Sequence, residues 1–146
     1  MRLDVILRVI SKLFIPFIIM FGFYVQFHGD YGPGGGFQAG VIIAAAVILY
    51  AIVFGKAAAL KAVPKWAVEA MVPLGVLLFA GVGVWSLVQG TNYLDYDALM
   101  HSPPTHEEAI HGQHWGVFLV ELGVLITVTG TMITIFYSFA GRGRSE

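Results

Sequence analysis

The amino-acid sequence predicts an all-α integral membrane protein with four transmembrane helices and both termini in the cytoplasm. Hydrophobic residues make up 58% of the 146 residues and charged residues 12%, which is about half the charged fraction of a soluble domain. The hydrophobic residues form four continuous runs rather than the alternating pattern of a membrane β-barrel. The basic residues lie on one side of these runs, which indicates how the chain is oriented.

The four runs predict membrane spans at residues 5–27, 37–54, 67–88 and 116–139, joined in a single membrane domain over 1–146. A helix needs about 20 apolar residues to cross a hydrocarbon core roughly 30 Å thick. The first span has the basic start and apolar run of a signal peptide. However, its end, Gln26-Phe27-His28-Gly29, lacks the small residues of a cleavage site, so we expect a retained helix.

The eight lysines and arginines predict the orientation of the spans. All lie in segments or at helix ends on one side of the membrane: Arg2, Arg8, Lys12, Lys56, Lys61, Lys65, Arg142 and Arg144. The opposite segments, 28–36 and the outer loop 89–115, contain no Lys or Arg. Because positively charged segments are retained in the cytoplasm, we expect both termini and residues 55–66 there and the outer loop outside.

The composition excludes several kinds of site. The chain has no cysteine, which rules out disulfides, thiolate metal ligands and a cysteine nucleophile. A net charge of −1 offers no basic surface to a nucleic acid. The outer loop holds four of the five histidines, but His106-Glu107 is not followed by the second histidine of a zinc-binding H-E-x-x-H motif. We expect no metal, no cofactor and no nucleic-acid partner.

The most distinctive segment, residues 28–40, reads HGDYGPGGGFQAG and leads into the second span. Irregular backbone at membrane depth is tolerated where protein or a water-filled cavity surrounds it. Free N–H groups at the start of the next helix would favour an anion or a polar side chain. The alternative is a tight outer turn that uses glycine for steric reasons. Beyond it, Gly36, Gly40 and Ala44 form a small-residue seam that predicts close helix packing.

Glu121 is the sharpest single candidate for a functional residue. It lies six residues beyond Trp115, hence about 9 Å below the outer interface. An ionisable side chain is costly there and marks a functional site by default. His114 lies nearly two turns earlier on the same face, so the pair is a candidate proton or cation relay. The alternative is an inter-subunit hydrogen bond that fixes assembly.

Three further patterns predict local structure. Gly116, Gly123 and Gly130 recur every seven residues beside a row of hydroxyl residues, on a different face from Glu121. This face predicts helix packing, with a hydroxyl-lined ion path as the alternative. The spacing Thr105-x-x-Glu108 matches a capping box, which predicts a helix start at His106. In the first turn of the third span, Glu69 is expected to reach the cytoplasmic interface.

The run PGGGFQAG at Pro33–Gly40 resembles the MnhB family, the B-type subunits of the Mrp-type multisubunit sodium/proton antiporters. The resemblance includes the upstream histidine, the four-span layout and the small size, and it extends over nearly the whole chain. The family often has Gly-Gly after the glutamine, where this chain has Ala39-Gly40. The matching positions of the family motif are His28, Pro33, Gly34, Gly35, Gly36 and Phe37.

The resemblance implies a small subunit of a complex that exchanges cytoplasmic sodium for external protons across the prokaryotic plasma membrane. Its implied partners are the A, C, D, E, F and G-type subunits and membrane lipid, with Na+ and H+ as the transported ions. The implied role is assembly, with a contribution to the sodium route as a further expectation. No enzymatic activity is implied.

Two rival functions stay open. The chain alone is not expected to transport, because it has few intramembrane charges and no visible inverted repeat. One rival is nevertheless a self-sufficient small channel or homo-oligomeric proton conductor. The other is a membrane hydrolase that uses the outer histidines and glutamates.

Overall fold

The computed structural model describes residues 2–29, 35–99 and 106–141, which form helices joined by short connections. The elements are α1 (Arg2–Phe27), α2 (Gly36–Phe54), α3 (Lys56–Ala62), α4 (Lys65–Val88), the 3-10 helix η1 (Tyr96–Leu99) and α5 (His106–Gly141). Within these ranges no strand occurs. The all-α class predicted from the sequence is therefore confirmed.

Four helices are long and apolar enough to cross a membrane. The candidate spans are Val5–Phe27, Gly36–Phe54, Lys65–Val88 and Gly112–Ala140. The last of these belongs to α5, which begins at His106, the residue where the sequence predicts a helix start. Thr105, the first residue of the expected capping box, lies outside the described residues.

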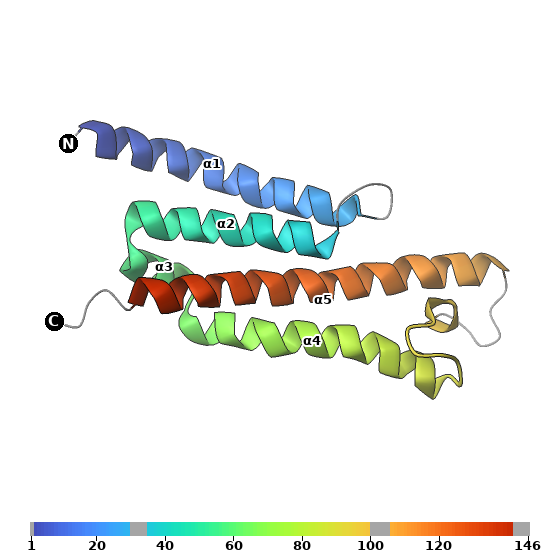
Figure 1. The fold of residues 1–146 in the computed structure, drawn as a ribbon. Helices are drawn as coiled ribbons and strands as arrows, with labels where there is room; N and C mark the ends of the chain where they lie inside the picture. Colours follow the sequence, from blue (N-terminus) through green and yellow to red (C-terminus); the bar gives the residue numbers. More distant parts are fainter. Residues whose placement is uncertain (1, 30–34, 100–105, 142–146) are drawn as a thin grey trace.

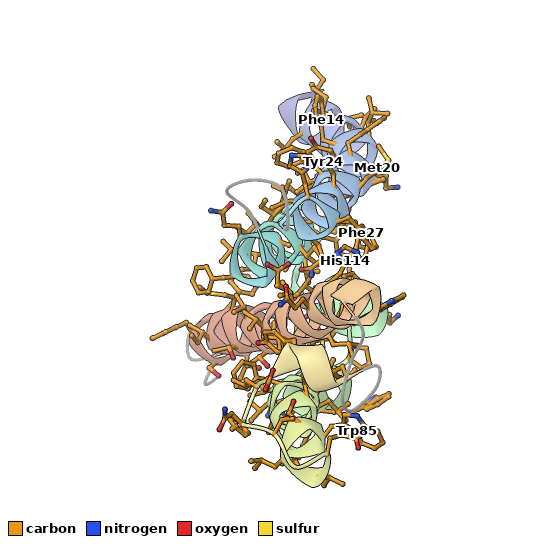
Figure 2. The ribbon with its side chains drawn as sticks, turned by 90° about the vertical axis from the view of Figure 1, so that its right-hand side faces the viewer. Phe14, Met20, Tyr24, Phe27, Trp85 and His114 are labelled. Carbon is orange, nitrogen blue, oxygen red and sulfur yellow. The ribbon has the colours of Figure 1, made fainter. Side chains whose placement is uncertain are left out.

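The four long helices form one row in the order α1, α2, α5, α4 (Figures 1 and 2). Small residues dominate the contacts inside the row, and half of the buried hydrophobic residues described are alanines: Ala39, Ala44, Ala46, Ala51 and Ala59. Large apolar side chains, such as Phe17 on α1, lie exposed on the outside. This distribution is typical of membrane helices, whose backbones approach closely where side chains are small.

One face of α5 packs against the small-residue seam of α2. A Cβ at Gly36 would overlap the backbone carbonyl oxygen of Glu121, and a Cβ at Gly40 would lie 2.9 Å from the carbonyl oxygen of Leu125. The Thr129 hydroxyl on α5 donates a hydrogen bond of 3.1 Å to the carbonyl of Gly40. The packing role predicted for the seam is confirmed, and α5 is its partner.

A second face of α5, which carries the repeated glycines, packs against α4. A Cβ at Gly123 would lie 2.8 Å from the carbonyl oxygen of Gly75, and a Cβ at Gly130 would lie 3.1 Å from that of Val68. The neighbouring hydroxyls bond within the helix: Thr127 donates to the Gly123 carbonyl at 2.9 Å, and Thr131 donates to the Thr127 carbonyl at 2.8 Å. These contacts support the packing prediction over a hydroxyl-lined path.

The two ends of the row differ. At one end α3 connects α2 to α4 and lies near the last residues of α5, and α1 begins at the same end of the row (Figure 1). At the other end η1 packs beside α5, and the chain between α4 and η1 is tied back to α4. The Ser86 hydroxyl donates to the carbonyl of Asp95 at 3.0 Å, and the Thr91 hydroxyl donates to the carbonyl of Ser86 at 2.9 Å.

Candidate functional site

The carboxylate of Glu121 lies where three helices meet: the end of α1, the start of α2 and the middle of α5. A Cβ at Gly29 would lie 2.6 Å from Oε2 of Glu121, and a Cβ at Gly35 would lie 2.6 Å from Oε1. Real Cβ atoms do not approach an oxygen so closely. The carboxylate therefore occupies space that opens because these two residues have no side chain.

Gly35 and Gly36 are needed for different reasons. Gly35 has a φ of 108°, in the region that favours glycine. Its N–H donates to the carbonyl of Val25 at 3.4 Å, and its own carbonyl accepts a bond from Ala39 at 3.1 Å, so it joins α1 to the first turn of α2. At Gly36 the requirement is close approach, because its Cα faces the backbone of Glu121.

The other residues of the family motif lie elsewhere or outside the described residues. His28 is exposed, and its ring stacks on that of Tyr24 with centroids 5.4 Å apart. Phe37 is 60% exposed on the outside of α2. Pro33 and Gly34 lie outside the described residues. The structure thus brings Gly35 and Gly36 of the motif to Glu121 and leaves His28 and Phe37 at the surface.

His114 lies on α5 near the end of the helix that begins at His106. The side chain is exposed and projects from α5 on the side of α1 and α2 (Figure 2). Close by, the Phe118 ring stacks on that of Phe27 at 5.7 Å and meets the edge of Trp115 at 6.1 Å. These aromatic contacts join α1 to α5 between the levels of His114 and Glu121.

Gln26 is a candidate that the sequence analysis did not identify. It is 2% exposed, and neither atom of its amide has a hydrogen-bond partner among the described residues. It lies one turn after Gly22, which approaches α2, and three residues before Gly29, which approaches Glu121. A buried amide without a partner is costly in an apolar environment. The only signal in the sequence is one uncharged polar residue in an apolar helix.

The polar side chains at this junction offer oxygen atoms as ligands. Carboxylate and amide oxygens suit protons and hard cations such as Na+. Within the described ranges, no group of three His, Asp or Glu side chains comes together to hold a metal. His101 in the outer loop, and the side chains of residues 106–111, lie outside what the structure describes.

Comparison with known proteins decides the family. Residues 6–134 match the model of a domain related to the MnhB subunit of the Na+/H+ antiporter. The chain belongs to the MnhB family. It is therefore a multi-pass plasma-membrane protein and a subunit of a multisubunit Na+/H+ antiporter, whose other subunits are its partners. This confirms the function that the resemblance implied, and the MnhB family is a transporter component.

Individual MnhB-family relatives align along their whole length. A relative from Staphylococcus haemolyticus is 32% identical over 139 residues, which cover 94% of this chain and 95% of the relative. Relatives from Staphylococcus aureus and Staphylococcus epidermidis are 32% and 34% identical, and each alignment covers 97% of both chains. All three carry the name "Putative antiporter subunit mnhB2".

Proposed function

We propose that this MnhB-family subunit contributes an ionisable group, Glu121, to ion passage through the antiporter. The glycine segment brings α1, α2 and α5 close enough together to hold that group. One observation carries the proposal: the Glu121 carboxylate fills the space left by the missing side chains of Gly29 and Gly35. Two sequence features that lie far apart in the chain thus form one site.

The free-energy cost of placing the ionisable side chain of Glu121 within the membrane supports a role in ion passage. It lies within the span Gly112–Ala140, where an ionisable side chain is expensive and marks a functional site by default. Gly29 is half-buried, so the carboxylate lies beneath a position at the edge of the junction that has no side chain to cover it. Among the described residues, Gly29 leaves an approach to the carboxylate for an ion or proton, because glycine has no side chain.

Two further side chains fit the same role. His114 is exposed on the outer side, and an imidazole ring can both donate and accept a proton. It lies seven residues before Glu121, roughly 10 Å along α5, so a water would carry a proton between them. The buried Gln26 amide supplies an oxygen for a water or a cation at the α1 side.

The arrangement of the helices favours a role inside a complex. A single row of four helices does not enclose a pathway, so the second wall of any route has to come from neighbouring subunits. This disfavours a self-sufficient channel. The proposed role also requires only reversible binding of a proton or cation, so it is one of transport and involves no catalytic residue.

A structural role for Glu121 is the second candidate. It is favoured by the contact between Gly36 and the backbone of Glu121, which fixes α2 against α5 irrespective of charge. In that case the carboxylate anchors the connection between α1 and α2, and its ionisation is incidental to transport.

The substitution Glu121→Gln separates the two roles, because glutamine keeps the shape and removes the titrating carboxyl. We expect the complete antiporter to assemble in normal amount and its sodium-dependent proton flux in everted vesicles to fall to below about a tenth. Asp95→Asn is the matched control, since it makes the same change of charge outside the spans. Full flux with Glu121→Gln, together with loss of assembly in Glu121→Ala, would establish the structural role instead.

A further inference from the structure

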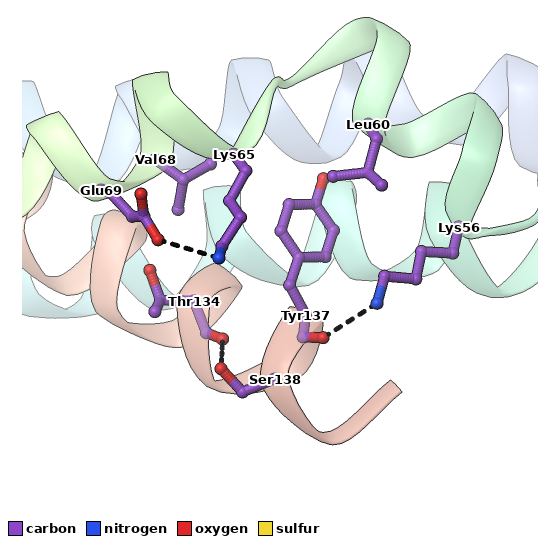
Figure 3. A pocket seen from close by; sticks show the side chains of 8 residues that line it. All are labelled: Lys56, Leu60, Lys65, Val68, Glu69, Thr134, Tyr137 and Ser138. Carbon is purple, nitrogen blue, oxygen red and sulfur yellow. Dashed lines mark hydrogen bonds and ion pairs between the residues drawn. The ribbon is translucent and has the colours of Figure 1, made fainter. Parts of the chain in front are cut away.

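A pocket of about 250 Å³ lies at the opposite end of the row from the outer loop, where α3, α4 and α5 meet (Figure 3). Its polar lining comes from all three helices: Lys56, Lys65, Glu69, Thr134, Tyr137 and Ser138. Neither the glycine segment nor Glu121 takes part. The pocket is therefore separate from the site proposed for ion passage.

Two lysines give this pocket its charge. Lys56 opens α3, and its ammonium donates to the carbonyl of Tyr137 at 3.1 Å. Lys65 opens α4, and its ammonium lies 3.3 Å from the carboxylate of Glu69 (Figure 3). Glu69 is the fifth residue of α4 and not in its first turn as the sequence predicted, because α4 begins at Lys65, two residues earlier than expected. With two cations and one anion, the lining is positive overall.

The donors of these lysines are not used up. An ammonium carries three N–H donors, and each lysine has one polar partner within the described part of the chain. The ion pair of Lys65 is exposed, with 71% of the lysine and 53% of the glutamate side chain accessible. An exposed pair of this kind is weak. Both ammonium groups are therefore available to a stronger anion.

Thr134 provides an independent indication that the pocket has a ligand. Its hydroxyl oxygen is buried against the pocket and has no hydrogen-bond partner among the described residues. A buried polar group without a partner is destabilising, and most threonines in helices avoid this by bonding to the preceding turn. Here Ser138 and Thr131 make such bonds and Thr134 does not. A phosphate oxygen in the pocket would supply the missing acceptor.

The position of the pocket matches that of lipid headgroups. Lys56 follows the end of the second span by two residues, and Lys65 is the first residue of the third span. Next to it, Trp66 is exposed, as interfacial aromatics are. Near the same end of α5, the side chains of Ile135 and Phe139 are also exposed, so apolar surface is available there to acyl chains. Soluble phosphate would gain nothing from that surface.

We propose that this pocket binds the phosphate of an anionic phospholipid headgroup. The ammonium groups of Lys56 and Lys65 and the hydroxyl of Thr134 donate to the phosphate oxygens, and the acyl chains lie along α5. Basic pockets between helices at the cytoplasmic interface bind anionic headgroups by this chemistry. The lipid would join α3 to α4 and α5 at the end of the row.

The test uses the purified antiporter complex in detergent, with phosphatidylglycerol as the probe and phosphatidylcholine as the neutral comparison. We expect phosphatidylglycerol to raise the thermal midpoint of the complex. Lys56→Gln combined with Lys65→Gln should weaken phosphatidylglycerol binding at least about tenfold and remove one bound lipid in native mass spectrometry. Lys61→Gln, on an exposed lysine of α3 outside the pocket, should leave binding unchanged.

Thr134→Val is the second variant, because it removes the hydroxyl and keeps the shape. If the lipid is bound, phosphatidylglycerol should stabilise this variant less than the parent or the control Thr131→Val. An increase in stability with an unchanged response to lipid would show an empty pocket and overturn the proposal. Equal stabilisation by soluble glycerol phosphate would overturn it in favour of a free anion. Loss of assembly in the lysine variant, with unchanged lipid binding by Thr134→Val, would indicate an acidic residue of another subunit instead.

Discussion

The Glu121 junction and the lysine pocket lie at different levels of the same helix and hold charged groups in opposite ways. At Glu121, the neighbouring glycines have no side chains, so the carboxylate packs directly against their backbone. At the pocket, two lysines extend into a space of about 250 Å³ that the protein leaves unfilled. The first arrangement fixes one geometry for one group, whereas the second can accept an external ligand.

The two sites should respond to different kinds of substitution: the junction to a change of side-chain size, and the pocket to a change of charge or hydrogen bonding. At Gly36 a single added methyl group meets backbone atoms of Glu121, which cannot move away by rotating a side chain. In the lysine pocket an added or lost group changes a charge or a hydrogen bond while the helices stay in place. We therefore expect steric substitutions to act strongly at the first site and polar ones to act more weakly at the second.

We expect α3 and the connection after α4 to lie on opposite sides of the membrane, and single cysteines can test this. The chain has no cysteine of its own, and both Lys61 and Gln89 are exposed. With an impermeant thiol reagent, Lys61→Cys should label from the cytoplasmic side alone and Gln89→Cys from the outer side alone. Labelling of both from one side would contradict the four-span topology.

Gly36→Ala should have the largest effect among the substitutions. Its Cβ would overlap the backbone of Glu121, so α2 and α5 must separate, and overpacking typically costs about 1–3 kcal/mol. We expect little intact complex after detergent extraction. The control is Gly81→Ala on α4, where a Cβ meets nothing within 4 Å. There alanine should be neutral or stabilise the helix by up to about 1 kcal/mol. Equal recovery of both variants would show that the α2–α5 contact is not tight.

Gly35→Ala and Gly55→Ala separate backbone strain from contact with the carboxylate. Both glycines have positive φ, at 108° and 91°. Each alanine variant should therefore have a free energy of unfolding about 1–2 kcal/mol lower because of backbone strain. Only at Gly35 does the Cβ also meet Glu121, since Gly55 has nothing within 4 Å. Thermal midpoints of the purified complex should fall further for Gly35→Ala. Adding Glu121→Ala to both variants should reduce the difference between their thermal midpoints. If the difference stays the same, the carboxylate is not what Gly35 accommodates.

Tyr137→Phe should have the smallest effect of the set. The Tyr137 hydroxyl donates to the carbonyl of Val63 at 3.1 Å, and loss of one such bond costs about 1 kcal/mol. The ring stays in place, so the lysine pocket should keep its shape and its response to phosphatidylglycerol. Tyr24→Phe, at an exposed tyrosine of α1, is the control and should not change the thermal midpoint. A collapse of the complex with Tyr137→Phe would show that the pocket end is as tightly determined as the junction.

The four long helices are predictable from the sequence because apolar length alone specifies a span. The short helix α3 was not predicted, since an isolated segment of seven residues is marginal as a helix. It forms because Ala59 is fully buried against the neighbouring helices. That burial depends on residues far away in the chain, which no local pattern reveals.

The candidate site was predictable in its parts and not in its assembly. Glu121 and the glycine segment each stand out by residue type, but helix periodicity assigns residues to faces without naming the neighbour of each face. The contact between Gly35 and Glu121 therefore required the structure. Gln26 escaped prediction because an uncharged amide in an apolar helix gives no sign of whether it is buried or exposed.

The length of α5 has a mechanical consequence. Its 36 residues contain no proline, whereas α1 and α4 contain Pro16 and Pro73. At 1.5 Å per residue the helix is about 54 Å long, against roughly 30 Å for the hydrocarbon core. The helix therefore extends beyond the hydrocarbon core, and Glu121 lies on the part within it. A displacement of the first residues of α5 is therefore expected to be transmitted along the helix to Glu121, because no proline interrupts it.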